Sequence, residues 1–263
     1  MLDESAGRRT PTSSLSALSD AALARELARL AGARLLELRR ALAHLPPREL
    51  KDRGDADAQS LLASGLTAAR PDDAVLSEEA ADDRLRLDAD RVWIVDPLDG
   101  TREYSENRSD WAVHVALWQR GDLVTGAVAL PGLDTVLTSD PAPAVPPRSA
   151  SAPLRMAVSR SRPPAIATGV AEALGAELVE MGSAGFKVAA VVRGEADLYV
   201  HGGGQYEWDS AAPVAVARAA GLHASRLDGS PLRYNQPDPF LPDLVVCRPG
   251  VADEVLGVIS DLQ

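Results

Sequence analysis

Leucine residues recur at steps of three and four between residues 19 and 42, which is the period of an amphipathic helix. Ser19 or Asp20 would cap the start of this helix, and Pro46-Pro47 would end it. Residues 56–69 are expected to form a second helix. The pattern therefore predicts that the folded chain begins with two helices, the first of which buries a leucine-rich face.

Strands are expected where β-branched and aromatic residues replace this helical pattern. A short apolar run at Val75-Leu76 precedes residues 91–96 (RVWIVD), which have the character of a buried strand. We expect that strand to end at Asp-Pro, because proline cannot donate to a sheet. Two further strands are expected near 111–118 and 123–130, with Gly121-Asp122 in the turn between them.

The segment 139–153 (SDPAPAVPPRSASAP) is rich in Pro, Ala and Ser, which is typical of a linker or an exposed loop. We expect it to separate two halves, residues 15–148 and 149–263, which pack together around a cleft behind a disordered tail at residues 1–14. Strands and helices alternate beyond it, which predicts a layered α/β (α+β) architecture. The expected elements are strands 154–158, 177–181, 196–200 and 243–247, and helices 164–174, 184–193, 209–220 and one from about 251.

Composition narrows the class of protein. The chain has 263 residues, 46% of them hydrophobic, and a net charge of -11, which argues against nucleic-acid polymers and anionic membranes as partners. A phosphate substrate stays possible, since a bound divalent cation can reverse the local field. No apolar run is long enough to span a membrane, and the first residues lack the apolar stretch of a secretory signal, so we expect a cytoplasmic monomer or homodimer. Cys247 and His114 are both expected to be core residues.

The segment from Asp96 to Thr101 (DPLDGT) carries the clearest candidate chemistry. The strand before it would deliver Asp96 to its carboxyl end, and Asp99 returns close to Asp96 within one turn. Two carboxylates this close repel each other unless a proton or a cation lies between them, and oxygen ligands suit Mg²⁺ or Mn²⁺. Gly100 would let the backbone approach a ligand, and the N–H groups around Thr101 would favour a phosphate. The alternative is an Asp-Gly turn that caps a helix.

Three other acidic clusters can be explained either by an ordinary structural role or by a function at the site. Asp209, in WDSAA, would be either an ordinary helix N-cap or a metal ligand. Glu78, in SEE, would lie in a solvated loop or at the site. Asp55 and Asp57 lie in a charged stretch at residues 51–57 (KDRGDAD), which is also typical of a helix start.

With these motifs the sequence resembles the inositol monophosphatase superfamily, which comprises Mg²⁺-dependent, lithium-sensitive phosphatases with an αβαβα sandwich fold. DPLDGT is similar to the family's D-P-[IL]-D-G-[ST], WDSAA to its W-D-x-[AG]-A, and SEE to its usual G-E-E, with Ser77 in place of Gly. The resemblance extends over residues 18–260. Further features resemble the CysQ branch, the 3'-phosphoadenosine 5'-phosphate phosphatases of sulfate assimilation: LSEE, DPLDGTREY, YEWDSAAP, LDGSPLRYN, and Gly182-Ser183-Ala184 with Lys187.

The resemblance implies a role for each matching residue. The site would bind two or three Mg²⁺ ions, which Mn²⁺ could replace. Li⁺ would inhibit the activity. Asp55 would hold the third and weakest metal ion, with Asp57 as the alternative, because KDRGD is shorter than the family's stretch. Thr101, oriented by Asp55, would position the attacking water and accept its proton, and Glu78 would share in catalysis. The implied metal ligands are the carboxylates of Glu78, Asp96, Asp99, Asp209 and Asp55, and the carbonyl of Leu98.

The implied reaction is hydrolysis of 3'-phosphoadenosine 5'-phosphate to AMP and phosphate by a metal-activated water. Tyr206 and Trp208 could stack on a base, although Trp208 is as well explained by packing. The alternatives are an inositol-1-monophosphatase, a fructose-1,6-bisphosphatase, or a non-catalytic homologue that binds metal or nucleotide as a sensor. The implied substrate contacts are Gly100, Thr101, Arg102, Ser183, Lys187 and Asp209.

Overall fold

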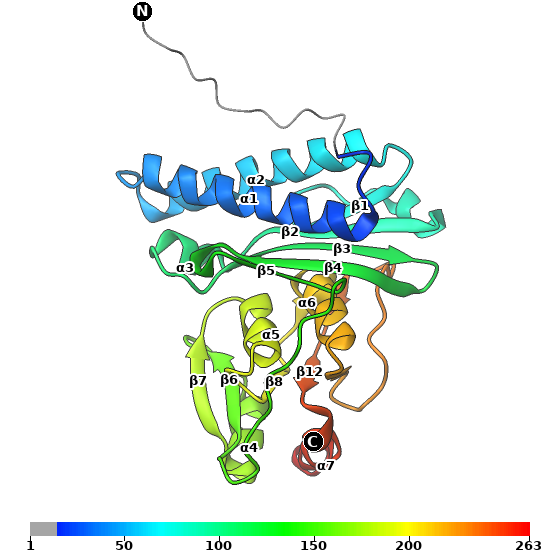
Figure 1. The fold of residues 1–263 in the computed structure, drawn as a ribbon. Helices are drawn as coiled ribbons and strands as arrows, with labels where there is room; N and C mark the ends of the chain where they lie inside the picture. The colour runs from blue at the N-terminus through cyan, green and yellow to red at the C-terminus, as the bar shows by residue number, and fades with distance from the viewer. Residues whose placement is uncertain (1–14) are drawn as a thin grey trace, which may run out of the picture.

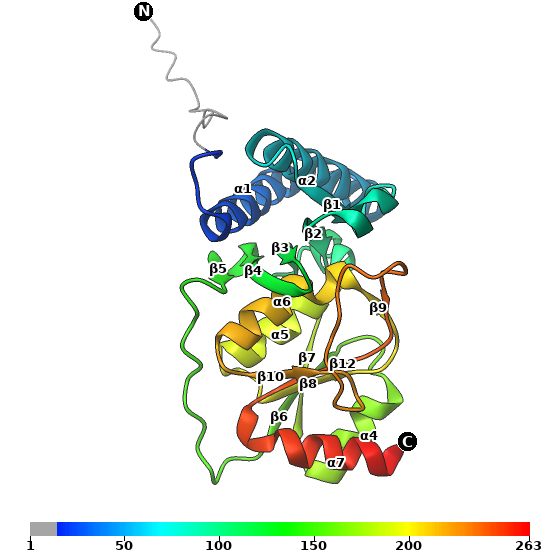
Figure 2. The same cartoon turned by 90° about the vertical axis from the view of Figure 1, so that its right-hand side faces the viewer.

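Five layers stack in the order helix, sheet, helix, sheet, helix in the computed structural model, which describes residues 15–263 (Figures 1 and 2). The αβαβα sandwich expected from the sequence is thereby confirmed. The tail predicted at residues 1–14 lies outside the described residues.

The first sheet has five strands in the order β1-β2-β3-β4-β5, parallel between β1 and β2 and antiparallel elsewhere. Helices α1 and α2 cover its outer face (Figure 2), and Ser19 caps α1 by accepting a hydrogen bond from the N–H of Ala22. The elements of this half are α1 Asp20–Ala41, α2 Pro47–Ala69, β1 Ala74–Ser77, the 3₁₀ helix η2 Arg84–Asp88, β2 Arg91–Asp99, α3 Thr101–Ser105, β3 Ala112–Gln119, β4 Asp122–Leu130, η3 Pro131–Leu133 and β5 Thr135–Thr138.

The second sheet has the order β10-β12-β8-β6-β7 and lies between two helical layers. Helices α5 and α6 fill the space between the sheets, and α4 and α7 cover the far side (Figure 2). A separate two-stranded sheet joins β9 to β11. The elements are β6 Arg155–Ser159, α4 Ala165–Leu174, β7 Glu177–Met181, α5 Ala184–Val192, β8 Leu198–His201, β9 Gln205–Tyr206, α6 Glu207–Ala219, β10 His223–Ser225, β11 Phe240–Leu241, β12 Leu244–Cys247, η4 Pro249–Val251 and α7 Ala252–Leu262.

Side chains of β2 alternate between two hydrophobic clusters, as the pleat of a strand requires. Trp93 and Val95 belong to the cluster under α1 and α2, whereas Val92 and Ile94 belong to the cluster around α5 and α6. The second cluster continues to Tyr199 in the second sheet, so the two halves share one core. By the same alternation, Asp96 faces the α5 and α6 side.

Two boundaries differ from the expectation. Helix α2 begins at Pro47 rather than at residue 56, because proline is favoured in the first helical turn, where its missing N–H is not needed. The charged stretch at residues 51–57 therefore lies inside the helix. Strand β2 does not end at Asp96 but continues to Asp99 across a register shift. The unpredicted strands β5, β9, β10 and β11 are only two to four residues long.

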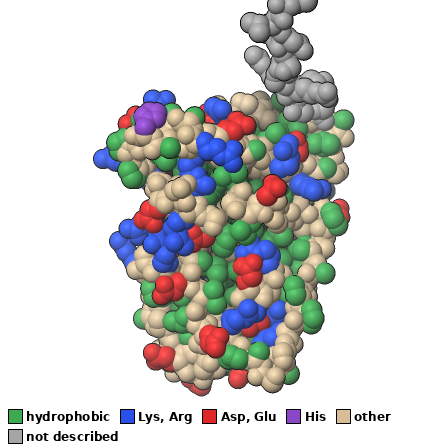
Figure 3. All heavy atoms as spheres, turned by 60° about the vertical axis from the view of Figure 1, so that its left-hand side comes forward, with side chains coloured by type: hydrophobic (Ala, Val, Ile, Leu, Met, Phe, Trp, Pro, Cys, Tyr) green, Lys and Arg blue, Asp and Glu red, His purple; other side chains and the backbone are tan. Residues whose placement is uncertain are grey.

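The surface mixes charges of both signs. On the face shown in Figure 3, acidic and basic side chains lie interspersed, and exposed ion pairs such as Arg34–Asp57 are part of the same surface chemistry. Within residues 15–263, no helix combines the length and the apolar character needed to cross a membrane.

Candidate metal centre

Three carboxylates from two different parts of the chain converge between the sheets. Asp96 and Asp99 lie on β2, and Asp209 is the third residue of α6. One oxygen atom from each carboxylate lies within 4.8 Å of the other two. Asp96 is completely buried, and Asp99 is nearly so. A group of oxygen ligands at this spacing could hold a hard divalent cation.

Asp96 is the least satisfied of the three. Its Oδ1 accepts a hydrogen bond from the N–H of Leu98 at 3.0 Å, whereas its buried Oδ2 has no hydrogen-bond partner. Burial, together with the charges of Glu78 and Asp99, raises the pKa of Asp96 well above its usual range. A buried acceptor without a donor is costly, and a cation at Oδ2 would remove that cost.

Asp99 is held by the first turn of α5. Its Oδ2 accepts hydrogen bonds from the Ser183 hydroxyl at 2.5 Å and the N–H of Gly185 at 2.6 Å. Its Oδ1 accepts one from the N–H of Ala184 at 3.1 Å. The start of a helix favours a negative charge, so α5 orients this carboxylate. Ser183 adopts φ 50°, a left-handed conformation that is unusual for serine.

Asp209 and Glu78 complete the acidic region. Asp209 accepts a hydrogen bond from the N–H of Tyr206 at 2.6 Å as the N3 residue of a capping box whose N-cap is Tyr206, and it also belongs to the cluster. Burial and the charge of Asp99 raise the pKa of Asp209 to about 7. Glu78 follows β1 and keeps an exposed surface, yet loss of surrounding water and the nearby acids raise the pKa of its carboxyl to about 7. The prediction of Asp209 as the N-cap is therefore wrong, because α6 begins two residues earlier, at Glu207, with Tyr206 as its N-cap.

Asp55 lies on α2 near the same region. The helix passes so close to the DPLDGT segment that a Cβ on Gly54 would lie 3.1 Å from a methyl of Leu98. One turn later, Gln59 accepts a hydrogen bond from Ser77, next to Glu78. Burial and the charge of Glu79 raise the pKa of Asp55 to about 7.

Asp57 points elsewhere: its carboxylate makes a two-pronged ion pair with Arg34 on the surface between α1 and α2. Of the two candidates, the structure thus brings Asp55 toward the acidic region. Within residues 15–263, no hydrogen bond joins Asp55 to Thr101.

Gly100 and Thr101 lie beside the cluster. Gly100 has φ 89°, and a Cβ there would lie 3.0 Å from Cβ of Ser183, so glycine suits both the conformation and the space. Thr101 is the first residue of α3 and is partly exposed. Arg102 is exposed and lies 3.4 Å from the carboxylate of Glu106.

Lys187 is buried rather than open to a substrate. Its ammonium donates hydrogen bonds to the carbonyls of Gly182 at 3.2 Å and Ser183 at 2.5 Å, and it lies over the ring of Tyr199. Burial lowers the pKa of Lys187. The Ser183 hydroxyl is likewise used inside the protein, since it also accepts from the N–H of Phe186. Both side chains brace the turn that holds Asp99.

His114 is buried, as predicted, but its place against the site could not be read from the sequence. It lies opposite Asp96 in the β2–β3 register. Its Nδ1 lies 3.1 Å from the carbonyl of Trp208 and donates to it, since a carbonyl can only accept. Its Nε2 lies 3.3 Å from Oδ2 of Asp99, and burial lowers its pKa.

An aromatic surface lies next to Asp209. The rings of Tyr206 and Trp208 stack with centroids 4.8 Å apart, and Phe240 meets Tyr206 edge-on at 5.9 Å. Tyr206 and Phe240 are each almost half exposed, which is unusual for large apolar rings. We call Tyr206, Trp208 and Phe240 the aromatic surface.

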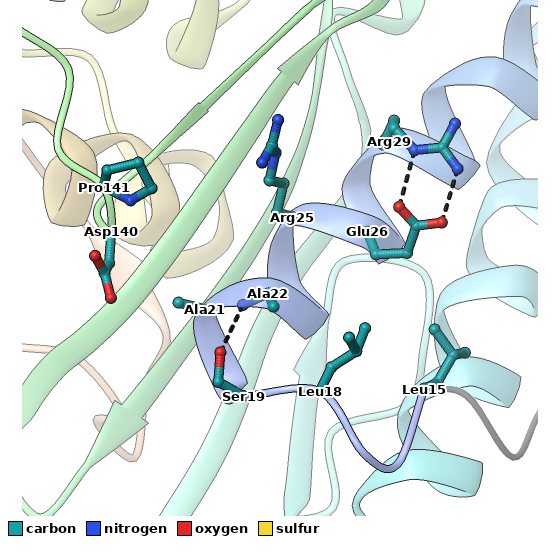
Figure 4. Close-up of a pocket in the computed structure, with 10 residues that line it drawn as sticks. All are labelled: Leu15, Leu18, Ser19, Ala21, Ala22, Arg25, Glu26, Arg29, Asp140 and Pro141. Atoms are coloured by element: carbon teal, nitrogen blue, oxygen red, sulfur yellow. Dashed lines mark hydrogen bonds and ion pairs between the residues drawn. The ribbon is translucent and has the colours of Figure 1, made fainter.

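The site is marked by charge rather than by cavity size. A hollow of about 640 Å³ lies on the α1 side of the first sheet, where the start of α1 faces Asp140 and Pro141 (Figure 4). Its polar groups are already paired in part, as the Arg29–Glu26 ion pair shows. None of Asp55, Glu78, Asp96, Asp99 and Asp209 lines it.

Comparison with known proteins agrees with the acidic motifs. The sequence profile described as Inositol monophosphatase family matches residues 21–257. The chain belongs to the inositol monophosphatase family. Its members are metal-dependent phosphatases, which fits a centre built from carboxylates. The resemblance suggested by DPLDGT and WDSAA is thereby confirmed.

Relatives within this family give a finer picture. The 3'-phosphoadenosine 5'-phosphate phosphatase of Mycobacterium leprae is 54% identical over 93% of this chain and 95% of its own. The 3'(2'),5'-bisphosphate nucleotidase CysQ of Escherichia coli is 32% identical over 71% of this chain and 80% of its own. The crystal structure of CysQ from Bacteroides thetaiotaomicron superposes with a TM-score of 0.74 at 26% identity, covering 91% of this chain and 98% of that one.

Proposed function

We propose that this chain is a Mg²⁺-dependent phosphatase that hydrolyses 3'-phosphoadenosine 5'-phosphate to AMP and inorganic phosphate. The observation that carries the proposal is the convergence of Asp96, Asp99 and Asp209 in a member of a metal-dependent phosphatase family. The substrate is supported by the mycobacterial relatives of that name, which are 53–54% identical over most of the chain.

The residues present fit a hard cation. The ligand atoms are all oxygens, and Asp96 keeps a buried Oδ2 that has no hydrogen-bond partner. When bound, Mg²⁺ or Mn²⁺ would offset the charge of the phosphate oxygens and lower the pKa of a water molecule, and Li⁺ would compete for the same ligands. We assign two or three ions to the carboxylates of Asp96, Asp99, Asp209, Glu78 and Asp55, and to the Leu98 carbonyl.

The chain's own groups would then orient the reactants. The backbone N–H groups at Gly100 and Thr101 would bind phosphate oxygens, and the Thr101 hydroxyl would hold the attacking water in line. Asp55 or Glu78 would accept the proton of that water. A carboxylate in this role is most effective when its pKa lies near the working pH.

Substrate selection would come from groups around the metal centre. The aromatic surface offers exposed rings on which a flat base can stack, as base-binding proteins commonly use. Arg102 would reach the second phosphate after leaving Glu106. Ser183 and Lys187 would act on the substrate indirectly, by holding the turn that orients Asp99.

A phosphate-release panel tests the proposal. With Mg²⁺ present, kcat/KM for 3'-phosphoadenosine 5'-phosphate should exceed the values for inositol-1-phosphate and fructose-1,6-bisphosphate. Asp99→Asn should abolish release while the thermal unfolding curve shows a folded protein. Preference for inositol-1-phosphate would assign the other family activity, and metal binding without any release would indicate a non-catalytic homologue.

A further inference from the structure

Arg86 is a buried guanidinium outside the acidic cluster. It lies in η2 and is only 1% exposed. Its Nε and Nη2 donate to the carboxylate of Asp82 at 2.7 and 3.0 Å. Its Nη1 donates to Oδ1 of Asn235 at 2.6 Å, and its Nη2 also donates to the carbonyl of Gln236 at 2.9 Å. Arg86 thereby joins two segments that are 149 residues apart in the sequence.

The segment that Arg86 grips is fixed from its other side by Glu207. The N–H groups of Asn235 and Gln236 donate to the two carboxylate oxygens of Glu207 at 2.6 and 2.7 Å. Asn235 has φ 58°, a conformation that asparagine tolerates better than most residues, and its Nδ2 returns a hydrogen bond to the carbonyl of Arg86 at 3.3 Å. Glu207 is the first residue of α6 and is almost fully buried.

The Glu207 end of this network adjoins the aromatic surface. Glu207 directly follows Tyr206, and the N–H of Glu207 donates to the carbonyl of Pro239, next to Phe240. The pairing of β9 with β11 then places Tyr206 opposite Phe240. Removal of the grip on Asn235 would therefore leave the segment that leads to Phe240 held from one side only, by Glu207.

A network of buried charges is a poor source of stability, because a well-packed apolar set of the same volume is usually as stable. Its specific benefit is a single fixed geometry, and the planar, two-pronged guanidinium provides this better than lysine does. We therefore expect the role of Arg86 to be the orientation of the segments that it joins.

We propose that Arg86 is a positioning residue for nucleotide binding. Through Asn235 and Glu207 it keeps the aromatic surface in the arrangement on which the base of the substrate stacks. This inference rests on the proposed function, and it adds a residue that touches neither substrate nor metal. It predicts an effect on substrates that carry a base and none on substrates that lack one.

The test compares three variants of the full chain. Arg86→Met removes the grip, and Asn235→Gly removes only the amide group while glycine keeps the left-handed backbone. Arg248→Met is the matched control, because Arg248 also pairs with a buried carboxylate, Asp197 at 2.8 Å, in the second sheet. The measurements are KM and kcat for 3'-phosphoadenosine 5'-phosphate, kcat/KM for 2-glycerophosphate, AMP affinity from Tyr and Trp fluorescence, and Tm.

Arg86→Met should raise KM for the nucleotide and weaken AMP binding by about tenfold, the size of one lost charged hydrogen bond, with kcat changed less than about twofold. Asn235→Gly should give a smaller change of the same kind. The kcat/KM for 2-glycerophosphate should stay unchanged in both. Arg248→Met should lower Tm without changing KM.

Two results would overturn the inference. Equal losses on the nucleotide and on 2-glycerophosphate would place the effect at the metal centre, and a fall in Tm with unchanged KM and AMP affinity would leave Arg86 a structural residue. A wild-type chain that binds AMP but releases no phosphate from the bisphosphate would contradict the proposed function instead. The AMP titration would then still decide the role of Arg86.

Discussion

The first turn of α5 leaves no room for a side chain at residue 185. A Cβ on Gly185 would lie 1.9 Å from Nε2 of His114 and 3.1 Å from Oδ2 of Asp99. Ordinary van der Waals contact begins at 3.4 Å, so the Cβ and the imidazole would have to move apart by about 1.5 Å. The imidazole is fully buried and is bonded to the carbonyl of Trp208, so α5 must move instead.

Gly185→Ala should therefore damage the site and the fold together. Movement of α5 withdraws the N–H that Gly185 donates to Asp99. A misplacement of about 1 Å near reacting groups costs on the order of 100-fold in rate, so we expect kcat/KM to fall by about that factor. Overpacking typically costs about 1–3 kcal/mol, and at about 2–4 °C per kcal/mol for a chain of this size we expect Tm to fall by several degrees.

Gly257→Ala is the matched control. Gly257 lies exposed in α7, and a Cβ there would meet nothing within 4 Å. Alanine is favoured over glycine inside a helix by about 1 kcal/mol, so this variant should be as active as the wild type and slightly more stable. At Gly185 the helical preference for alanine would stabilise the fold, whereas the clash with His114 would destabilise it. Phosphate release and thermal unfolding measure both, and a stabilised, fully active Gly185→Ala would refute the described packing of α5 on His114.

Three further predictions concern carboxylates and buried charge. Asp55→Ala should lower kcat by about 100-fold or more, as loss of a general base does. Asp57→Ala loses only an exposed ion pair worth about 0–1 kcal/mol and should keep the wild-type kcat. The reverse result would transfer the role to Asp57. Lys187→Met should lower Tm and reduce hydrolysis of nucleotide and inositol phosphates alike, since its ammonium bonds two carbonyls within the chain; a loss confined to the nucleotide would show direct contact. The rise in Tm on adding Mg²⁺ should grow from about pH 5 to pH 8. The folded-state pKa values of Asp55, Glu78 and Asp209 are raised to about 7, so their ionisation destabilises the metal-free fold as pH rises. A rise in Tm that stays constant with pH would contradict this repulsion.

Much of the fold follows from short-range patterns in the sequence. The leucine period of α1, the β-branched run of β2 and the alternation after residue 153 each predict an element that is present, with boundaries within a few residues. The large error is the start of α2. Pro46-Pro47 predicts the end of a helix, but proline also suits the first turn of a helix, and α2 begins at Pro47.

The sequence predicts which acidic residues form the site, but not the contacts around them. Asp96, Asp99 and Asp209 come together as the motifs indicate: Asp96 and Asp99 lie in the last four residues of β2, and Asp209 lies in the first turn of α6. The contacts of His114 depend on the register between β2 and β3 and on the approach of α6, neither of which a local pattern encodes. Arg86 depends on a partner 149 residues away, so no spacing rule could have found it.

Three departures from ordinary folding rules lie at or beside Asp99. Asp96 keeps a buried oxygen without a donor, Ser183 holds a left-handed backbone, and Gly185 excludes even a methyl group. The unpaired oxygen and the left-handed serine each lower the stability of the chain by themselves. Two of them act directly on Asp99, since Ser183 and Gly185 both donate to its carboxylate. Natural sequences keep such conflicts where function requires them, so the strain beside Asp99 supports the same acidic region that the motifs indicate.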